Sequence, residues 1–148
     1  MRALEQRVSD TDEGFTLIEL LVVMIIIAVL AAIAIPVFLN QRSKADDATA
    51  KGDLRNLANF EEIYLNDYGT YSSIANVRLD EPNIFPSKNI TLTVVDYDGV
   101  SGYCLSAMNS SNSHTWYYDS EGGGLQPYGS TGCPDVTTGL PGGSVSNP

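Results

Sequence analysis

The chain has 148 residues, a formal net charge of −10 at pH 7, and 43% apolar residues. This length suits one modest domain with additional elements. Its eight Lys and Arg residues do not cluster, which argues against nucleic acid binding, because phosphate contacts need a basic surface. The acidic balance by itself indicates only a solvated outer surface.

Residues 1–14, MRALEQRVSDTDEG, are polar and contain no apolar core of their own. The character of the chain changes abruptly between Gly14 and Phe15. A common secretory signal is cleaved after its apolar segment, and small residues near Ala34 would permit a cut there. However, the apolar stretch is longer than a typical signal core and merges into a helical segment, which argues against that site.

An apolar run follows this break. Every residue from Leu20 to Ile35 is apolar, and after Pro36 the run continues to Leu39, giving twenty residues without a charge. At about 1.5 Å per residue this length spans a hydrocarbon core of about 30 Å, so we predict membrane insertion. Glu19, at the front of the run, then lies at the membrane edge, is neutral, or has a cationic partner, because an isolated charge in hydrocarbon is unfavourable.

Residues 40–67 continue the helical pattern but present two different faces. Apolar side chains recur at helical spacing, and the opposite face is polar and charged. We therefore predict one long helix that is apolar all round in residues 15–39 and amphipathic in residues 40–67. Pro36 should kink it or open a backbone hydrogen bond, Gly52 is a second soft point, and the helix should end near Gly69.

Residues 68–136 are predicted to form a small globular head. Residues 70–89 have little periodicity and contain two prolines, which indicates a loop. Three strand-like runs separated by turns follow at 90–97, 103–108 and 114–119. They predict an antiparallel sheet, and the amphipathic half of the helix is the natural partner for one of its faces. The last residues, 137–148, offer almost nothing to bury, so we expect a flexible tail.

The two cysteines, Cys104 and Cys133, both follow the apolar run. If that part of the chain lies outside the cytoplasm, a disulfide between them is expected, and it would stabilise the fold by about 3–4 kcal/mol in the chain-entropy model. Two unrelated free thiols are the alternative. The predicted fold class is therefore α+β: a long N-terminal helix with a membrane-spanning first half, packed by its second half on a small antiparallel sheet with a disulfide-closed C-terminal loop.

The segment GFTLIELLVVMIIIAVLAAIAIPVF, which begins at Gly14, resembles the amino-terminal segment of type IV prepilins and the related pseudopilins. The features that carry the resemblance are Gly14 before the cleavage point, Phe15 after it, Glu19 four residues further on, and Pro36 within the helix. The resemblance is strong over about residues 8–66 and extends to the rest of the chain only in general layout.

The resemblance implies that residues 1–14 are a leader peptide. A membrane-embedded prepilin peptidase would cut between Gly14 and Phe15 and then methylate the new amino group of Phe15. The leader departs from the family, since two Arg stand against four acidic residues, whereas family leaders are more often basic. The charges that follow the apolar run also give little topological bias, so the expected orientation follows from the resemblance.

The resemblance also implies a role for Glu19. Cleavage creates a cation at Phe15, which would meet Glu19 of a neighbouring subunit and favour the staggered register that satisfies both groups. The alternative is a Glu19 hydrated near the lipid headgroups. Pro36 is either a harmless kink or the place where the helix melts during assembly. The implied partners are further copies of the subunit in a homo-polymer, the prepilin peptidase, the pilus assembly machinery, and membrane lipid before assembly.

Catalytic chemistry is sparse in this sequence. His114, the sole histidine, is expected at a surface or strand edge, and no Ser or Cys has an evident base and orienting group. The cysteines lack the spacing of a zinc site, and we expect no cofactor and no enzyme. Asp119 and Glu121 are weak calcium candidates in the glycine-rich stretch 119–124, where an ordinary turn is the favoured interpretation.

The leading functional hypothesis is a structural subunit of a type IV pilus, which polymerises through its N-terminal helix into a cell-surface filament for adhesion, twitching motility or DNA uptake. It would span the cell membrane once before assembly and lie in an extracellular pilus on the bacterial surface afterwards. A pseudopilin of a type II secretion-like system is the nearest alternative, and a calcium site at 119–124 would favour it. A monomeric membrane-anchored binding module is the third, and it requires an uncut leader and a Glu19 whose replacement changes nothing.

Overall fold

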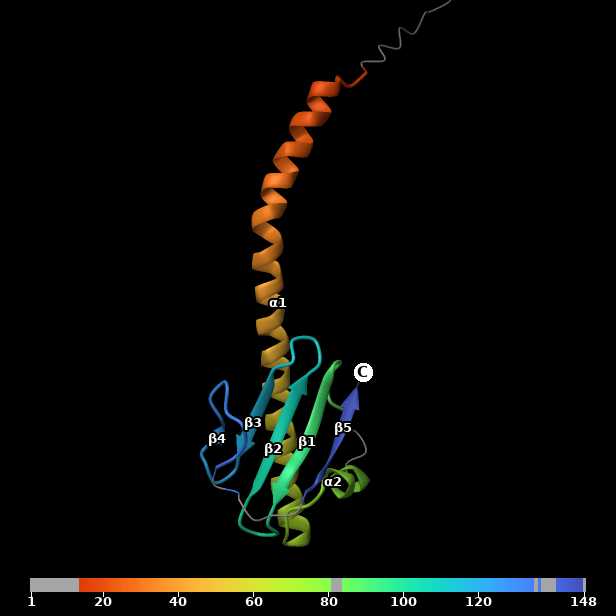
Figure 1. Ribbon diagram of the computed structural model, residues 1–148. Coiled ribbons are helices and arrows are strands. Elements are labelled where there is room, and N and C mark those ends of the chain that lie inside the picture. Colours follow the sequence, from red (N-terminus) through yellow and green to blue (C-terminus); the bar gives the residue numbers. More distant parts are fainter. Residues whose placement is uncertain (1–13, 81–83, 135, 137–140, 148) are drawn as a thin grey trace, which may run out of the picture. The chain divides into compact units, whose positions relative to one another are not determined.

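A computed structural model describes residues 14–80, 84–134, 136 and 141–147 (Figure 1). The chain divides into two compact units, residues 1–39 and 40–148. The first unit contains the apolar half of a long helix, and the second contains the other half of that helix together with a β-sheet. The predicted α+β fold class is confirmed.

Helix α1 runs from Leu17 to Tyr68 and contains Pro36. Because proline lacks an amide N–H, the carbonyl four residues before Pro36 has no helical donor, yet the helix continues past this point. At the other end, Gly69 adopts a φ of 73°, a left-handed conformation that glycine tolerates well, and its amide donates to the Leu65 carbonyl at 2.8 Å. The predicted helix end near Gly69 is confirmed.

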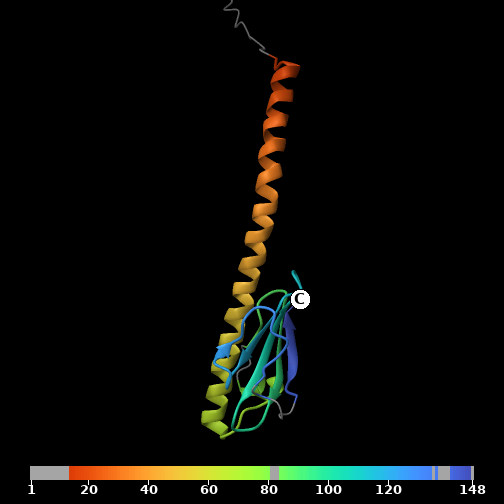
Figure 2. The same cartoon turned by 60° about the vertical axis from the view of Figure 1, so that its left-hand side comes forward.

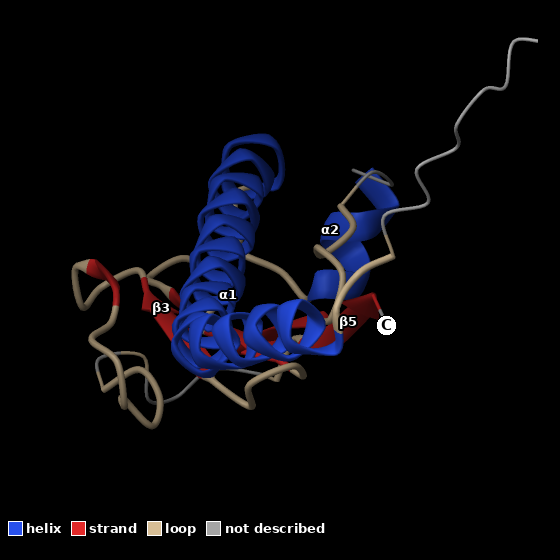
Figure 3. Ribbon diagram, turned by 90° about the horizontal axis from the view of Figure 1, so that it is seen from above, coloured by secondary structure: helices blue, strands red, loops and turns tan. Residues whose placement is uncertain are grey.

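The second unit contains a five-stranded antiparallel sheet with the order β4-β3-β2-β1-β5 (Figure 1). Its strands are β1 (Ile90–Tyr97), β2 (Tyr103–Asn109), β3 (Thr115–Asp119), β4 (Gly124–Leu125) and β5 (Gly143–Asn147). The first three match the predicted runs to within one residue at either end, whereas β4 and β5 lie outside those runs. Seen from above in Figure 3, β3 and β5 lie toward opposite sides of the sheet.

The core of the second unit lies between α1 and one face of the sheet (Figure 2). The buried apolar side chains of α1 recur at helical spacing and are Ala50, Leu54, Leu57 and Ala58. On β1 the buried apolar side chains alternate along the strand and are Ile90, Leu92 and Val94. Because each large aliphatic side chain contributes about 1.5–3 kcal/mol when fully buried, this layer holds the helix and the sheet together.

Residues 74–80 form a second helix, α2 (Ile74–Asp80), so the prediction of a loop over residues 70–89 is wrong here. Ser73 precedes the helix, and its carbonyl accepts a hydrogen bond from the Val77 amide at 3.1 Å. Ile74 and Val77 lie three residues apart and are both buried. Two apolar anchors in seven residues are too few to produce a recognisable period in the sequence.

The prediction of a flexible tail over residues 137–148 is wrong for residues 143–147, which form β5 along the outer edge of β1. Part of the remaining range lies outside the described residues. Val145 is the buried apolar residue of this strand and lies opposite Leu92. The strand is otherwise polar, so its position depends mainly on the backbone ladder that β1 offers to it.

Cys104, in β2, and Cys133 form a disulfide with their Cα atoms 5.8 Å apart. The predicted pairing is therefore confirmed. The bond ties the loop that follows β4 to the central strand of the sheet.

Candidate functional site

Thr16 and Glu19 form a capping box at the start of α1. The amide and hydroxyl of Thr16 donate to Glu19 Oε2 at 2.9 and 2.8 Å, and the Glu19 amide donates to Thr16 Oγ1 at 3.3 Å. Since the first amides of a helix lack intrahelical acceptors, this exchange satisfies groups that would otherwise be unpaired. The signal in the sequence is the T-x-x-E spacing of TLIE, which is overlooked when Glu19 is considered only as a charge in a membrane.

Gly14 and Phe15, the predicted cleavage pair, precede this capped helix. The Phe15 side chain is 92% exposed, and among the described residues nothing lies within 4 Å of the position that a Cβ on Gly14 would take. The peptide bond between these two residues lies outside the helix.

The apolar half of α1, residues 17–39, leaves its side chains exposed in the isolated chain. By length and composition, α1 is the one helix among the described residues that could cross a membrane: an 18-residue window has a mean hydropathy of 3.2, and none of it is buried. So much exposed apolar surface must be covered by lipid or by other apolar helices, because its contact with water is strongly unfavourable.

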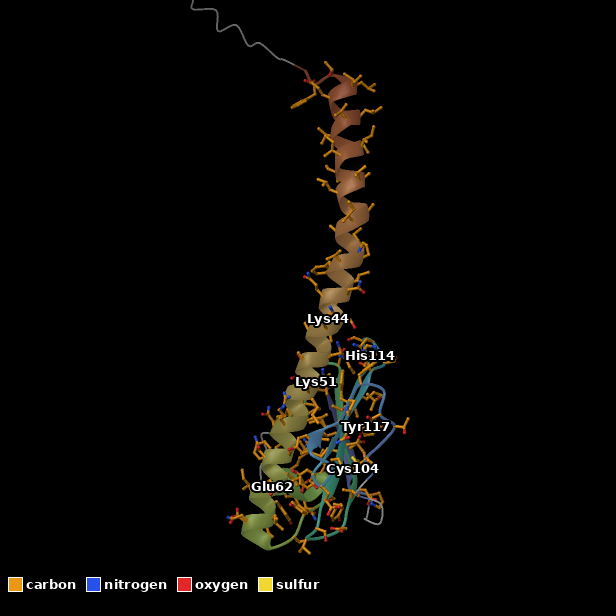
Figure 4. All side chains as sticks on the ribbon, turned by 90° about the vertical axis from the view of Figure 1, so that its left-hand side faces the viewer. Lys44, Lys51, Glu62, Cys104, His114 and Tyr117 are labelled. Atoms are coloured by element: carbon orange, nitrogen blue, oxygen red, sulfur yellow. A yellow bond between two sulfur atoms is a disulfide. The ribbon has the colours of Figure 1, made fainter. Side chains whose placement is uncertain are left out.

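His114, expected at a surface or strand edge, lies just before β3 with its side chain 30% exposed and in contact with α1. Its Nδ1 atom is 2.9 Å from Oδ1 and 3.1 Å from Oδ2 of Asp47, and the Asn112 side-chain amide donates to the same Oδ1 at 2.8 Å. Partial burial raises the pKa of Asp47, but the hydrogen bonds from Asn112 and His114 outweigh it and hold this pKa below its ordinary value. The cluster ties the β2–β3 turn to α1 (Figure 4), and nothing in the sequence indicates a contact between residues so far apart.

The cluster of His114, Asp47 and Asn112 holds the β2–β3 turn against α1. In the part of the chain that the structure describes, no hydrogen bond joins His114 to a Ser, Thr or Cys side chain. Beside it, Lys51 Nζ lies 3.6 Å from the ring centroid of Trp116, a cation–π contact that links α1 to the adjoining strand β3.

A second polar cluster joins α1 to the residues that follow it. Glu61 is buried, and its Oε2 accepts a hydrogen bond from the Ser72 amide at 3.2 Å. The Oε1 atom of Glu62 accepts from the hydroxyls of Tyr103 and Tyr71 at 3.0 and 3.3 Å. Two adjacent glutamates in a predicted helix do not reveal which of them is buried, so this cluster cannot be predicted from the sequence.

Burial and these contacts shift the pKa values of Glu61, Tyr71 and Tyr103. Burial raises the pKa of Glu61 to about 7; the hydrogen bond from Ser72 opposes the rise and the neighbouring Glu62 carboxylate adds to it. Burial and the Glu62 carboxylate also raise the pKa of Tyr71 to about 12 and that of Tyr103 well above its ordinary value. Both tyrosine hydroxyls therefore remain protonated donors.

Of the calcium candidates, Asp119 is the last residue of β3 and Glu121 lies in the turn between β3 and β4. Asp119 is buried, and its Oδ1 accepts hydrogen bonds from the amides of Glu121 and Gly122 at 3.1 and 2.8 Å. The Glu121 side chain packs over Gly102, where an added Cβ would lie 2.8 Å from its Cγ. Among the described residues, no three His, Cys, Asp or Glu side chains gather in an arrangement that could hold a metal ion.

Comparison with known proteins finds one matching family and several similar proteins. Residues 11–35 match the family described as the prokaryotic N-terminal methylation motif. Over 105 residues the chain is 35% identical to the type IV wide pilus major component PilA4 of Thermus thermophilus, covering 71% of this chain and 79% of that protein. It is 39% identical over 70 residues to the type IV major pilin protein PilA of Myxococcus xanthus, covering 47% of this chain and 32% of that protein. It is also 38% identical over 65 residues to the type II secretion system core protein G of Escherichia coli, covering 44% of this chain and 45% of that protein.

Proposed function

Since the chain belongs to the type IV pilin family, we propose that it is the structural subunit of a type IV pilus and polymerises through its N-terminal helix into a cell-surface filament. The observation that carries the proposal is the 105-residue match to a wide pilus major component. Helix α1 ends at residue 68 of the chain, so a match of 105 residues must extend past the helix into the head.

The proposed maturation uses the open segment in front of α1. A prepilin peptidase removes residues 1–14, which leaves an amino group on Phe15 that is then methylated. The subunit stays in the cell membrane through residues 17–39 until the pilus assembly machinery transfers it into the filament. There the helices of other copies replace lipid around the apolar side chains.

In the proposed filament, Glu19 both caps its own helix and pairs with the amino group of a neighbouring subunit. One carboxylate oxygen, Oε2, receives both hydrogen bonds from Thr16, and no hydrogen bond is recorded to Oε1 among the described residues. The second oxygen is therefore open to the Phe15 amine of a neighbouring subunit. A buried ion pair of this kind acts as a register device, because a subunit at a different height would leave both charges unpaired.

Adhesion, twitching motility and DNA uptake are the roles that we propose for the finished filament. A pseudopilin of a type II secretion-like system is the second candidate, favoured by the match to core protein G. That match covers 44% of the chain, against 71% for the pilus component, and this difference in coverage supports the pilus.

Mass spectrometry of filaments sheared from the cell surface tests the proposal. We expect a mature chain that begins at methylated Phe15 and is two hydrogens lighter because of the Cys104–Cys133 bond. An uncut chain found only in membranes would contradict both maturation and filament formation and would favour a monomeric anchored module. Filaments confined to the periplasm, with a secretion defect on deletion, would favour the pseudopilin.

Two substitutions separate the proposed tasks of Glu19. Glu19→Ala removes the charge and the cap, and we expect it to abolish filaments while the chain still enters the membrane. Thr16→Ala is the matched control, because it weakens the cap and keeps the charge. If Thr16→Ala lost filaments as completely as Glu19→Ala, capping alone would explain the defect and the proposed pairing would be wrong.

A further inference from the structure

Glu61 is a carboxyl group whose buried environment favours its neutral form. It lies on the inward face of α1 with 0% of its surface exposed. One oxygen, Oε2, accepts the hydrogen bond from the Ser72 amide, while Oε1 has no hydrogen-bond partner among the described residues. An ionised carboxylate has two oxygens to satisfy and a charge to compensate, so this site leaves it poorly solvated.

The neighbouring groups do not compensate a charge on Glu61. On α1 the adjacent side chain is Glu62, whose carboxylate opposes ionisation. The hydroxyls of Tyr71 and Tyr103 are protonated and donate to Glu62, and the Asp98 carboxylate in the β1–β2 turn acts on Tyr71. Among the residues that the structure describes, no Lys or Arg lies within salt-bridge distance of Glu61.

The contacts of Glu61 and Glu62 fasten the chain just after α1. Residues 71 and 72 are held to α1 by the Tyr71 hydroxyl and the Ser72 amide. Two residues further on, the Ile74 amide donates to the Gly142 carbonyl at 2.8 Å, and Ile74 begins α2. Because only Ser73 separates Ser72 from Ile74, release of residues 71 and 72 from α1 removes one of two attachments at the start of α2, the other being the Ile74–Gly142 bond. Figure 4 marks Glu62 at this end of α1.

We propose that Glu61 is a proton-operated latch: residues 71–73, and α2 behind them, stay packed over its buried carboxyl group when that group is neutral, and they open to admit water when it ionises. The pKa of about 7 that burial gives this group places the change near neutral pH. The latch is distinct from filament formation, because all of its parts lie within one chain.

Hydrogen exchange of the full-length chain in detergent micelles, followed by NMR, tests the latch on dispersed monomers. The pKa of Glu61 is about 7 in the closed form and 4.5 once the group is exposed, so between these values the open form binds fewer protons. The opening constant of residues 71–77, corrected for intrinsic exchange, should therefore rise roughly 30-fold from about pH 5.5 to about pH 8.5. Amides of the central strand β2 should show no such local rise.

Two variants make the assignment specific. Glu61→Gln has no charge to gain, so its residues 71–77 should stay protected over the whole range. Asp67→Asn is the matched control, since it removes an exposed acid from the same end of α1 and should keep the full pH response. A flat response in the unmodified chain, or an undiminished response in Glu61→Gln, would overturn the latch. The response of the unmodified chain decides the matter even if Glu61→Gln does not fold.

Discussion

Replacing Gly142 with alanine should separate β5 and α2 from the rest of the head. A Cβ on Gly142 would lie 2.3 Å from Cγ1 and 2.4 Å from Cβ of Val94, and 3.1 Å from the Val94 carbonyl oxygen. The same glycine joins two elements, because its amide donates to the Val94 carbonyl at 2.9 Å and its carbonyl accepts from the Ile74 amide. An added methyl group can be accommodated only if this segment moves away from β1.

The expected loss of stability follows from these contacts. Overpacking a well-packed site costs about 1–3 kcal/mol, and each backbone hydrogen bond that weakens adds up to about 1 kcal/mol. We therefore expect Gly142→Ala to lower the free energy of unfolding by about 2–4 kcal/mol. The sole tryptophan, Trp116, is buried in β3, so its fluorescence can follow urea unfolding of the full chain in micelles.

Two further variants sharpen the test. Gly132→Ala is the control, because no atom of the described residues lies within 4 Å of its added Cβ, and it should leave the urea midpoint unchanged. Val94→Ala removes the atom nearest to the new methyl group, so the two substitutions should be less harmful together than their sum, by about 1 kcal/mol. If Gly142→Ala keeps the midpoint of the unmodified chain, the close approach of this segment to β1 is refuted.

Two other predictions concern the links that hold loops to the head. Replacing both Cys104 and Cys133 with serine should lower the free energy of unfolding by about 3–4 kcal/mol, because the bond joins residues 29 positions apart; a loss below about 1 kcal/mol would contradict this. Asp47→Asn should lower the free energy of unfolding by about 1 kcal/mol at neutral pH, because it weakens the contact with His114. Because folding lowers the pKa of Asp47 from 3.8, its contribution is present above this pH and is lost as the pH falls through the folded-state value. The difference between the two chains should therefore shrink in acid, as pH-dependent urea midpoints would show, with Asp46→Asn as the neighbouring control.

The features that the sequence determined by itself are those with a local physical cause. An apolar run long enough to cross a membrane predicts its own helix, because no partner is needed to satisfy the backbone. The helix end near Gly69 depends on one residue that tolerates a positive φ. Strands β1, β2 and β3 show alternation or β-branched and aromatic enrichment over five to eight residues, which is enough to locate them. The capping box of Thr16 and Glu19 is also local and could have been recognised from its spacing.

The features that only the tertiary structure decided depend on groups far apart in the chain. Strand β5 is polar and has no strong preference of its own, and it becomes a strand because β1 offers an unpaired edge to it. The contact of His114 with Asp47 and the burial of Glu61 beside Ser72 arise when the amphipathic half of α1 settles on the sheet. Sequence periodicity indicates which face of a helix is apolar. The charge state of a carboxyl group, however, depends on the particular neighbours that packing brings to it.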